Sequence, residues 1–366
     1  MIVFGYRTLA TAAALALAAS ATPAMADGGT LKIKPGKDWT HKESRIRLPG
    51  KFELGALSEA KDFSSSQSDV GLTYQDGATQ TTTSVYVFRG STAEPSVWQD
   101  RIAAIVTSAQ NRLGTIKAET AIHGSFTPFG RSIDSGSLLV YAGGGNPTTA
   151  TGSAVMTSGE WVVAVRMSSR SLSPADLEQR LSAFASSIVL PSKAKGETET
   201  QAYVVKPCAE AANGPDAERS AGGMKEAIFV TLLGSAATQA TGEEDMGNAG
   251  KEALPRPYCR VAYDAANPSV YSQDGENHGY LVVAGDSGPV GTLLGMEAEG
   301  LEGVPRYAVA LVSSEQMTFY RGFSAFPTVM QFMNVLEKER PIGGIGRTPS
   351  TRRQINVVPV AEEKQP

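Results

Sequence analysis

The chain is poor in the residue types that carry most enzyme and metal chemistry. Among 366 residues it has three histidines and two cysteines, and aromatic residues make up 7%. Three scattered histidines do not provide the paired spacing of a zinc site, and neither cysteine lies in a C-x-x-C motif. After the first 26 residues, no stretch is long and apolar enough to cross about 30 Å of hydrocarbon. We therefore expect no metal, no cofactor and no membrane span.

The overall composition is that of a globular protein. Apolar residues make up 41% and charged residues 19% of the chain, and 38 glycines and 20 prolines favour many turns over a helical bundle. Charge is uneven: residues 27–190 carry 16 basic and 15 acidic side chains, whereas residues 191–366 carry 16 and 22. An acidic second half repels phosphate backbones, so we expect no nucleic acid partner.

The first 26 residues have the features of a secretory signal peptide. Arg7 is followed by the apolar run from Leu9 to Ala19 and by Ala24-Met25-Ala26, a small-x-small cleavage site. The alternative is an uncleaved N-terminal anchor, although the apolar run is short for one. Cleavage after Ala26 predicts a soluble protein that is periplasmic or secreted.

Export bears on how the two cysteines are interpreted. Cys208 and Cys259 are the only pair, and in an oxidising compartment a structural disulfide is expected. A redox-active or metal-binding thiol pair is the alternative, and the absence of a nearby histidine argues against it.

Apolar periodicity predicts two helices and several strands in the first half. Trp98, Ile102 and Ile105 begin a one-sided stripe over 95–113, and Ser173-Pro174-Ala175-Asp176 caps a second helix. That helix has a stripe formed by Leu177, Leu181, Phe184 and Ile188. Extended runs predict strands around the turn within 46–57, on both sides of Asp76-Gly77, and at 116–126, 136–142, 151–157 and 160–168.

The polar segment 191–201 predicts a linker between two domains, one over 46–190 and the other over 202–340. The second domain begins with a strand at 202–206 and contains helices near 223–240 and 327–339, the latter with Met330, Met333 and Leu336 inward. Further strands are expected at 258–264, 279–284, 289–296, 305–313 and 316–321. Residues 27–45 are expected to form a loose lead-in, and 341–366 a mobile tail. The fold class is therefore α+β, with two mainly antiparallel sheets, each covered by helices.

The first domain resembles a known family. An early Leu48-Pro49-Gly50 turn, a helix, four strands ending in Glu160 to Arg166 and a capped amphipathic helix follow one another in that order. This arrangement resembles the Mog1/PsbP-like α/β/α sandwich, whose exported bacterial members include DcrB-like proteins. The resemblance covers 46–190 and implies a sandwich fold without a shared set of catalytic residues. The second half resembles no family that we can name.

Three residues are candidates for catalysis. Gly285-Asp286-Ser287-Gly288-Pro289 is similar to the serine loop of chymotrypsin-like proteases, and His123 precedes it in the order that those enzymes use. One glycine of that loop is missing, and predicted helices occupy positions where the protease fold needs strands. His278 lies in a polar cluster, Asp274 to His278, that lacks calcium-loop order. A turn between strands and a solvated loop are the alternatives that we favour.

Other polar and aromatic groups have ordinary structural interpretations as well. Carboxylates at 243–245 and at 297, 299 and 302 could act in pairs on glycosidic bonds, but acidic loop residues are usually only solvated. Four tyrosines could line a contact surface or pack in the core: Tyr258, Tyr263, Tyr271 and Tyr280. The sequence thus favours a non-catalytic binding or assembly module of the cell envelope, with an unknown envelope protein or small ligand as partner. A hydrolase that uses Ser287 or the second-domain carboxylates is the alternative.

Overall fold

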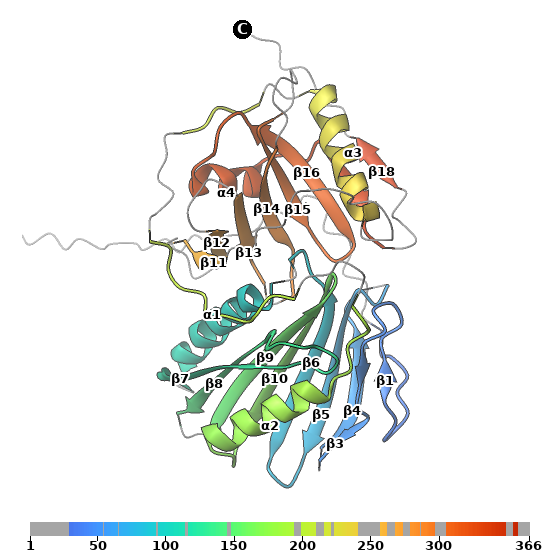
Figure 1. Cartoon of the computed structure of the whole chain (residues 1–366), viewed down its shortest axis with the longest axis vertical. Helices are drawn as coiled ribbons and strands as arrows, with labels where there is room; N and C mark the ends of the chain where they lie inside the picture. Colours follow the sequence, from blue (N-terminus) through green and yellow to red (C-terminus); the bar gives the residue numbers. More distant parts are fainter. Residues whose placement is uncertain are drawn as a thin grey trace, which may run out of the picture.

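Figure 1 shows the computed structural model of the chain. It describes residues 29–357, apart from 54, 65, 93, 114–115, 145–147, 194–198, 210–215, 221–222, 241–256, 262–267, 274–278, 286, 297–304 and 349–353. The predicted signal peptide and the centre of the predicted linker lie outside the described residues. No helix among those residues is long and apolar enough to cross a membrane.

The first half forms an eight-stranded antiparallel sheet with the order β3-β4-β5-β6-β10-β9-β8-β7. Its strands are β3 (Lys51–Phe52), β4 (Gly55–Asp62), β5 (Asp69–Asp76), β6 (Thr81–Arg89), β7 (Ile116–Phe126), β8 (Gly136–Gly143), β9 (Ala150–Ser158) and β10 (Trp161–Ser169). The hairpin predicted around Asp76-Gly77 is confirmed, because Asp76 pairs with Thr81. The predicted strands of this half are present, and β7 has the predicted bounds.

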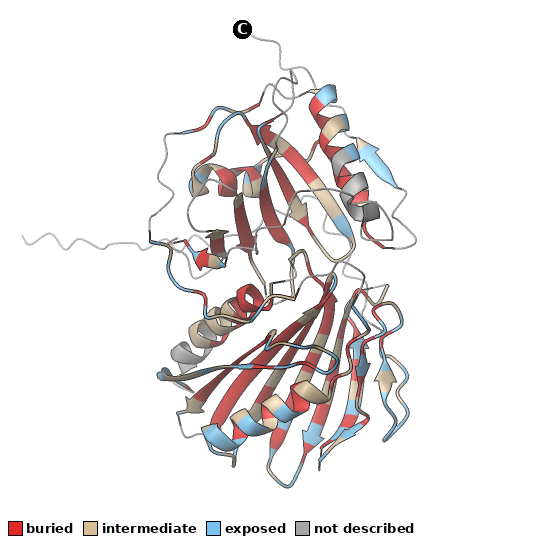
Figure 2. Ribbon diagram, in the orientation of Figure 1, coloured by how far each residue is buried: buried red, intermediate tan, exposed pale blue. Residues whose placement is uncertain are grey.

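Two helices cover opposite faces of this sheet. On one face, α1 (Pro95–Leu113) buries Trp98, Ile102 and Val106. On the other face, α2 (Pro174–Ser187) buries the predicted stripe that begins at Leu177. The predicted cap of α2 is confirmed, since the Ser173 hydroxyl accepts a hydrogen bond from the backbone N–H of Asp176. In Figure 2 the strands beneath α2 are largely buried.

The second half forms another eight-stranded antiparallel sheet, in which the strands follow sequence order from β11 to β18. They are β11 (Tyr258–Arg260), β12 (Ser269–Gln273), β13 (Gly279–Val283), β14 (Val290–Gly295), β15 (Tyr307–Val312), β16 (Gln316–Phe323), β17 (Gly343–Gly346) and β18 (Ile355–Val357). Helix α3 (Met224–Ala240) packs against Ala308 and Ala310 of β15, and α4 (Val329–Lys338) packs against Val309 of the same strand. Successive side chains of a strand point to opposite faces, so the two helices cover opposite faces of the sheet. The predicted α+β class with mainly antiparallel sheets and covering helices is confirmed.

The two sheets share a hydrophobic cluster. Trp98 and Ile102 of α1 belong to the same buried group as Tyr271, Leu281 and Val283 of β12 and β13. Figure 1 shows α1 between the first sheet and the strands of the second. That the two halves are separate domains therefore remains a prediction.

Several expectations about the ends of the chain are corrected. The lead-in is not loose throughout, because β1 (Trp39–Thr40) pairs with β2 (Arg47–Leu48) and His41 is fully buried. The stretch predicted as a mobile tail contributes β17 and β18 to the second sheet, where Ile345 is buried. In both places a few apolar side chains among polar ones complete a core that the local sequence does not indicate.

Two element predictions in the second half are also corrected. Residues 202–206 do not form the predicted strand. The segment lies beside β11 and pairs with it only at an isolated parallel bridge between Pro207 and Arg260. Helix α4 buries Met333 as predicted, but Met330 is exposed and Phe332 is fully buried instead. The buried face is therefore rotated from the predicted stripe.

Candidate functional site

The structure does not assemble the predicted catalytic residues. His123 lies on β7 in the first sheet, whereas Ser287 is half-buried in the turn between β13 and β14 of the second. Among the described residues, no hydrogen bond joins Ser287 to a base. His278 lies outside the described residues, as do the carboxylates at 243–245, 297, 299 and 302. A nucleophilic serine needs a base within hydrogen-bond distance, so these residues give no support to a serine hydrolase.

The three tyrosines of this group that the structure describes do not form an exposed surface. Tyr271 and Tyr280 are buried, the former in the cluster beneath α1 and the latter against Phe332 of α4. Tyr258 is half-buried, and burial raises its pKa to about 12. Tyr263 lies outside the described residues. The core interpretation of Tyr271 and Tyr280 is therefore the correct one.

His123 instead lines a pocket of about 350 Å³ on the α1 face of the first sheet. Its strand partner is Leu139, and Ser125 pairs with Ser137. Side chains alternate between the two faces of a strand, so all four point to the same side of the sheet. Leu139 belongs to the cluster beneath α1, which identifies that side. These residues form the floor of the pocket.

Helix α1 supplies one wall through Ser96, Gln99, Asp100 and Ala103. Their spacing of three, one and three places them on one face of the helix. The amide Nε2 of Gln99 donates to the Ser153 hydroxyl at 2.6 Å, but its Oε1 is buried and has no hydrogen-bond partner. An amide orientation is assigned from its hydrogen bonds, and in either orientation one polar atom of Gln99 lacks a protein partner.

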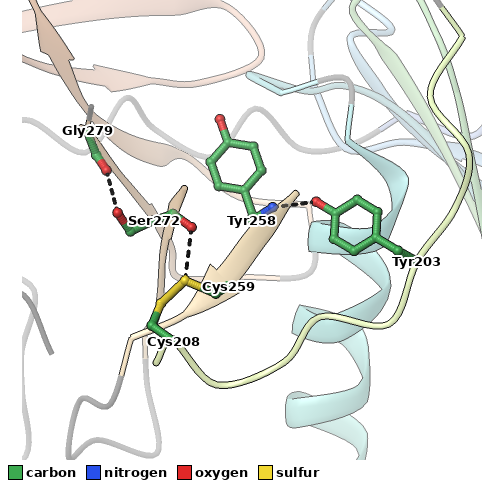
Figure 3. The surroundings of a disulfide bond; sticks show 6 residues. All are labelled: Tyr203, Cys208, Tyr258, Cys259, Ser272 and Gly279. Atoms are coloured by element: carbon green, nitrogen blue, oxygen red, sulfur yellow. Dashed lines mark hydrogen bonds between the residues drawn. A yellow bond between two sulfur atoms is a disulfide. The ribbon is translucent and has the colours of Figure 1, made fainter. Parts of the chain in front are cut away.

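Residues 202–205 form the opposite wall. The backbone N–H of Ala202 donates to the carbonyl oxygen of Asp134 at 2.9 Å, and that of Tyr203 donates to the Ser96 hydroxyl at 2.9 Å. The Tyr203 hydroxyl accepts a hydrogen bond from the backbone N–H of Tyr258 at 2.8 Å (Figure 3). The segment therefore bridges the loop before β8, the start of α1 and β11.

The disulfide anchors this wall. Cys208 and Cys259 are bonded, as predicted, and their Cα atoms are 4.9 Å apart. The backbone N–H of Arg260 donates to the carbonyl oxygen of Lys206, and that of Cys208 donates to the carbonyl oxygen of Arg260. Figure 3 shows the segment running past α1 to the disulfide at β11. The covalent bond thus keeps residues 203–208 beside the second sheet.

The only charged side chain that lines the pocket is already paired. The Asp100 carboxylate accepts hydrogen bonds from Arg260 Nε at 3.0 Å and from the Tyr271 hydroxyl at 2.9 Å. Burial raises the pKa of Tyr203, so the hydroxyl on the opposite wall stays neutral. Neither of these two side chains therefore offers an unpaired ion to a ligand.

The pocket is an open hollow rather than an enclosed cavity. Its volume is at the small end of the roughly 300–1,000 Å³ of ligand pockets, and it combines polar groups with apolar walls. Within the described ranges, no three His, Cys, Asp or Glu residues are grouped as metal ligands require.

Of the residues that line this pocket, only His123 is a candidate from the sequence. A signal in the sequence that could indicate the pocket is the second face of α1, where Ser96, Gln99, Asp100 and Ala103 recur at helical spacing. The pairing of Ser125 with Ser137 depends on strand register, which the sequence does not state. No family model, no curated protein and no solved structure matches this chain.

Proposed function

We propose that this protein is an exported module of the cell envelope that binds a small ligand in this pocket without catalysing a reaction. The observation that supports binding is the hollow of about 350 Å³ itself, which serine, histidine and apolar residues line between α1, the first sheet and residues 202–205. Catalysis is disfavoured because, among the described residues, no hydrogen bond joins His123 to Ser125 or Ser137, the serines beside it on the floor.

Location in the envelope is supported by two independent features. The first 26 residues have the pattern of a cleavable signal peptide. The chain also contains the Cys208–Cys259 disulfide, and disulfides persist mainly in oxidising compartments. We propose that the mature protein begins at Asp27 and is periplasmic or secreted.

Recovery of the protein from its native envelope tests both parts of the proposal. We expect the denatured chain to have the mass of residues 27–366, and the native chain to carry a small additional mass that denaturation releases. A Ser125→Trp variant places a large side chain from the exposed floor into the pocket, and we expect it to lose that mass. A chain that retains Met1, or a bound mass that Ser125→Trp does not change, would contradict the proposal.

The hydrolase alternative has its own test. The wild-type chain and Ser287→Ala are assayed side by side on a panel of activated esters, peptides and glycosides. We expect neither to turn over any of these substrates above the rate in buffer. Turnover by the wild type that Ser287→Ala abolishes would replace the binding proposal by the hydrolase.

A further inference from the structure

Polar contacts join the two halves of the chain around Arg89, at the end of β6. Arg89 Nη1 donates to the carbonyl oxygen of Arg347 at 2.8 Å, and Arg347 Nη2 donates to that of Gly90 at 2.8 Å. The backbone N–H of Arg347 donates to the carbonyl oxygen of Glu315, whose carboxylate accepts from the Ser66 hydroxyl at 2.8 Å. Arg347 and Glu315 belong to the second half and the other three residues to the first. We call these contacts the polar joint.

Two loops of the first half reach the polar joint. The loop over residues 41–46 carries Glu43, whose carboxylate forms an ion pair with Arg89. The loop over residues 62–69 carries Ser66. A group that holds both loops in place therefore also holds the joint.

The fully buried ring of His41 binds both loops. Its Nε2 lies 2.7 Å from the carbonyl oxygen of Gln67 in loop 62–69, and a carbonyl only accepts, so Nε2 carries a proton. Its Nδ1 accepts from the backbone N–H of Ser44 at 3.0 Å within loop 41–46. The neutral ring thus donates to one loop and accepts from the other.

Each loop also contains a residue in a strained backbone conformation. Gln67 has a φ of 60° and Arg45 a φ of 61°, in the left-handed region that residues other than glycine rarely adopt. Such a conformation costs about 1–3 kcal/mol and persists only where the surrounding contacts enforce it. His41 makes contacts of this kind, since its ring binds the carbonyl of Gln67 and its own carbonyl accepts from the N–H of Arg45 at 3.1 Å. Both loops can therefore relax when these contacts are lost.

A second proton on His41 is incompatible with this arrangement. The imidazolium carries N–H groups on both ring nitrogens, so Nδ1 no longer accepts from the N–H of Ser44. The two N–H groups would face each other at 3.0 Å in a buried site. The Ser44 hydroxyl, 2.7 Å from Nδ1, can accept in its place only if the Ser44 N–H moves away. Protonation therefore displaces loop 41–46, and Glu43 with it.

The elements packed around His41 bring two carboxylates and one guanidinium to it: Glu43, Asp62 and Arg89. The carboxylates favour the imidazolium and the guanidinium opposes it. Burial is the largest influence and lowers the pKa of His41 below its usual value. The neighbouring rings of Trp39 and Trp161 are uncharged, and Glu160 forms an ion pair with Arg89 Nε at 3.1 Å. The closed joint thus resists the proton that an open joint accepts.

We propose that His41 is an acid-sensitive switch for the polar joint. The neutral ring holds both loops and keeps the joint closed. A proton on the ring releases loop 41–46 and its ion pair between Glu43 and Arg89, so that the halves separate at the joint while each sheet stays folded. The switch is independent of the pocket and of any ligand in it.

Pulsed electron spin resonance between two nitroxide labels tests the switch in the full mature chain. The labels are attached at Gln179→Cys on α2 and Lys338→Cys on α4, two exposed positions in different halves, without reductant so that the native disulfide persists. We expect a single distance at neutral pH and a second, longer distance in mild acid. In the open joint His41 titrates near its ordinary value of about 6.5, so the ratio of open to closed chains should rise by up to about tenfold per pH unit between pH 6.5 and 5.

Variants link this response to the ring. His41→Gln can still donate to the carbonyl of Gln67 but takes up no proton, and we expect it to show one distance at all these pH values. His123→Gln, at an exposed position, is the matched control and should respond as the wild type does. Glu43→Gln leaves the ring in place but weakens the pair with Arg89, and we expect it to populate the longer distance already at neutral pH.

Three outcomes would overturn the switch: a distance that does not change with pH, a wild-type response in His41→Gln, or a midpoint near pH 4, where carboxylates titrate. Loss of far-UV circular dichroism in step with the longer distance would also overturn it, because acid would then unfold the sheets. If His41→Gln is open at neutral pH, the NMR titration of His41 in the wild type decides. A midpoint equal to that of the distance change supports the switch, and a different midpoint overturns it.

Discussion

At the scale of single residues, His41 shows how burial fixes a protonation state. It is fully buried; its Nε2 lies 2.7 Å from the carbonyl oxygen of Gln67, and its Nδ1 accepts from the backbone N–H of Ser44 at 3.0 Å. A carbonyl only accepts, so Nε2 carries the single proton. Burial lowers the pKa of His41 below its usual value, more than the hydrogen bond to Gln67 raises it. The folded chain therefore disfavours the imidazolium.

This predicts a loss of stability in mild acid. Below about pH 6.5 the unfolded chain takes up a proton at His41 that the folded chain resists, so the free energy of unfolding falls as pH falls. We expect a slope of up to about 1.4 kcal/mol per pH unit from this residue between pH 6.5 and 5. Urea unfolding of the wild type and His41→Gln measures it, and the slope should flatten in the variant. His123→Gln, at an exposed position, should keep the wild-type slope; equal slopes in all three chains would contradict the prediction.

The disulfide is a second determinant of stability at the scale of single residues. Cys208 and Cys259 are 51 positions apart, and the closure of such a loop stabilises a fold by about 4 kcal/mol in the chain-entropy model. We expect the double variant Cys208→Ser/Cys259→Ser to unfold at lower urea concentration by about that free energy. It should also bind ligand more weakly, because residues 203–205 of the pocket wall lose their covalent anchor. An unchanged midpoint, or free thiols in the native protein, would contradict this.

At the scale of elements, α3 shows that an apolar helix does not reveal which face it buries. Ile228 and Leu232 lie four positions apart on one side of α3, yet both are exposed, whereas Ala227 and Val230 are buried. Gly234 lies so close to β16 that an added Cβ would be 2.3 Å from Phe319 Cζ and 3.1 Å from Ile345 Cδ1. The missing side chain of Gly234, rather than the larger apolar residues, allows the close approach.

Gly234→Ala tests this close approach by the sign of its effect. Helix propensity alone would make the alanine variant about 1 kcal/mol more stable. Overpacking against Phe319 costs about 1–3 kcal/mol, so we expect a net destabilisation of about 1 kcal/mol in urea unfolding. Gly77→Ala is the control, since its added Cβ meets nothing within 4 Å. A stabilised Gly234→Ala chain would show that the packing is looser than described.

At the scale of the whole molecule, Arg347 ties the two sheets together. Its Nη2 donates to the carbonyl oxygen of Gly90 at 2.8 Å and lies 3.2 Å from the Glu160 carboxylate, both in the first half. Its own carbonyl oxygen accepts from Arg89 Nη1 at 2.8 Å. Arg347 comes from the stretch that the sequence predicts as a mobile tail. Because these bonds and the shared cluster beneath α1 both join the two halves, we expect the whole chain to unfold in one cooperative transition.

Two probes can test this cooperativity. The three tryptophans, Trp39, Trp98 and Trp161, all belong to the first half, whereas far-UV circular dichroism reports on both halves. We expect coincident urea transitions in the wild type. We expect Arg347→Met to lower the free energy of unfolding by at least about 2 kcal/mol. This is less than the 3–5 kcal/mol of a fully buried pair, because Glu160 still forms its ion pair with Arg89. The two urea transitions of this variant should separate. Arg340→Met, at an exposed position, is the control; separate transitions in the wild type would show independent domains.

The sequence by itself determined the local elements of this protein. Apolar periodicity and capping residues predicted α1, α2 and the strands of the first sheet, because a helix or strand buries a face whose spacing is written in consecutive residues. The cysteine pair predicted the disulfide. Short strands such as β12, β17 and β18 were missed, because few residues give too little periodicity and their pairing depends on neighbours.

Only the tertiary structure decided which faces meet. Register brings Ser125 opposite Ser137, a hydrogen bond from the Tyr203 backbone N–H to Ser96 holds 203–205 beside α1, and packing leaves an atom of Gln99 unpartnered. Each of these depends on residues far apart in sequence, whose approach is set by the summed packing of whole elements rather than by any local pattern. For the same reason the two buried tyrosines and the ordered C-terminal strands could be assigned only once both sheets were in place.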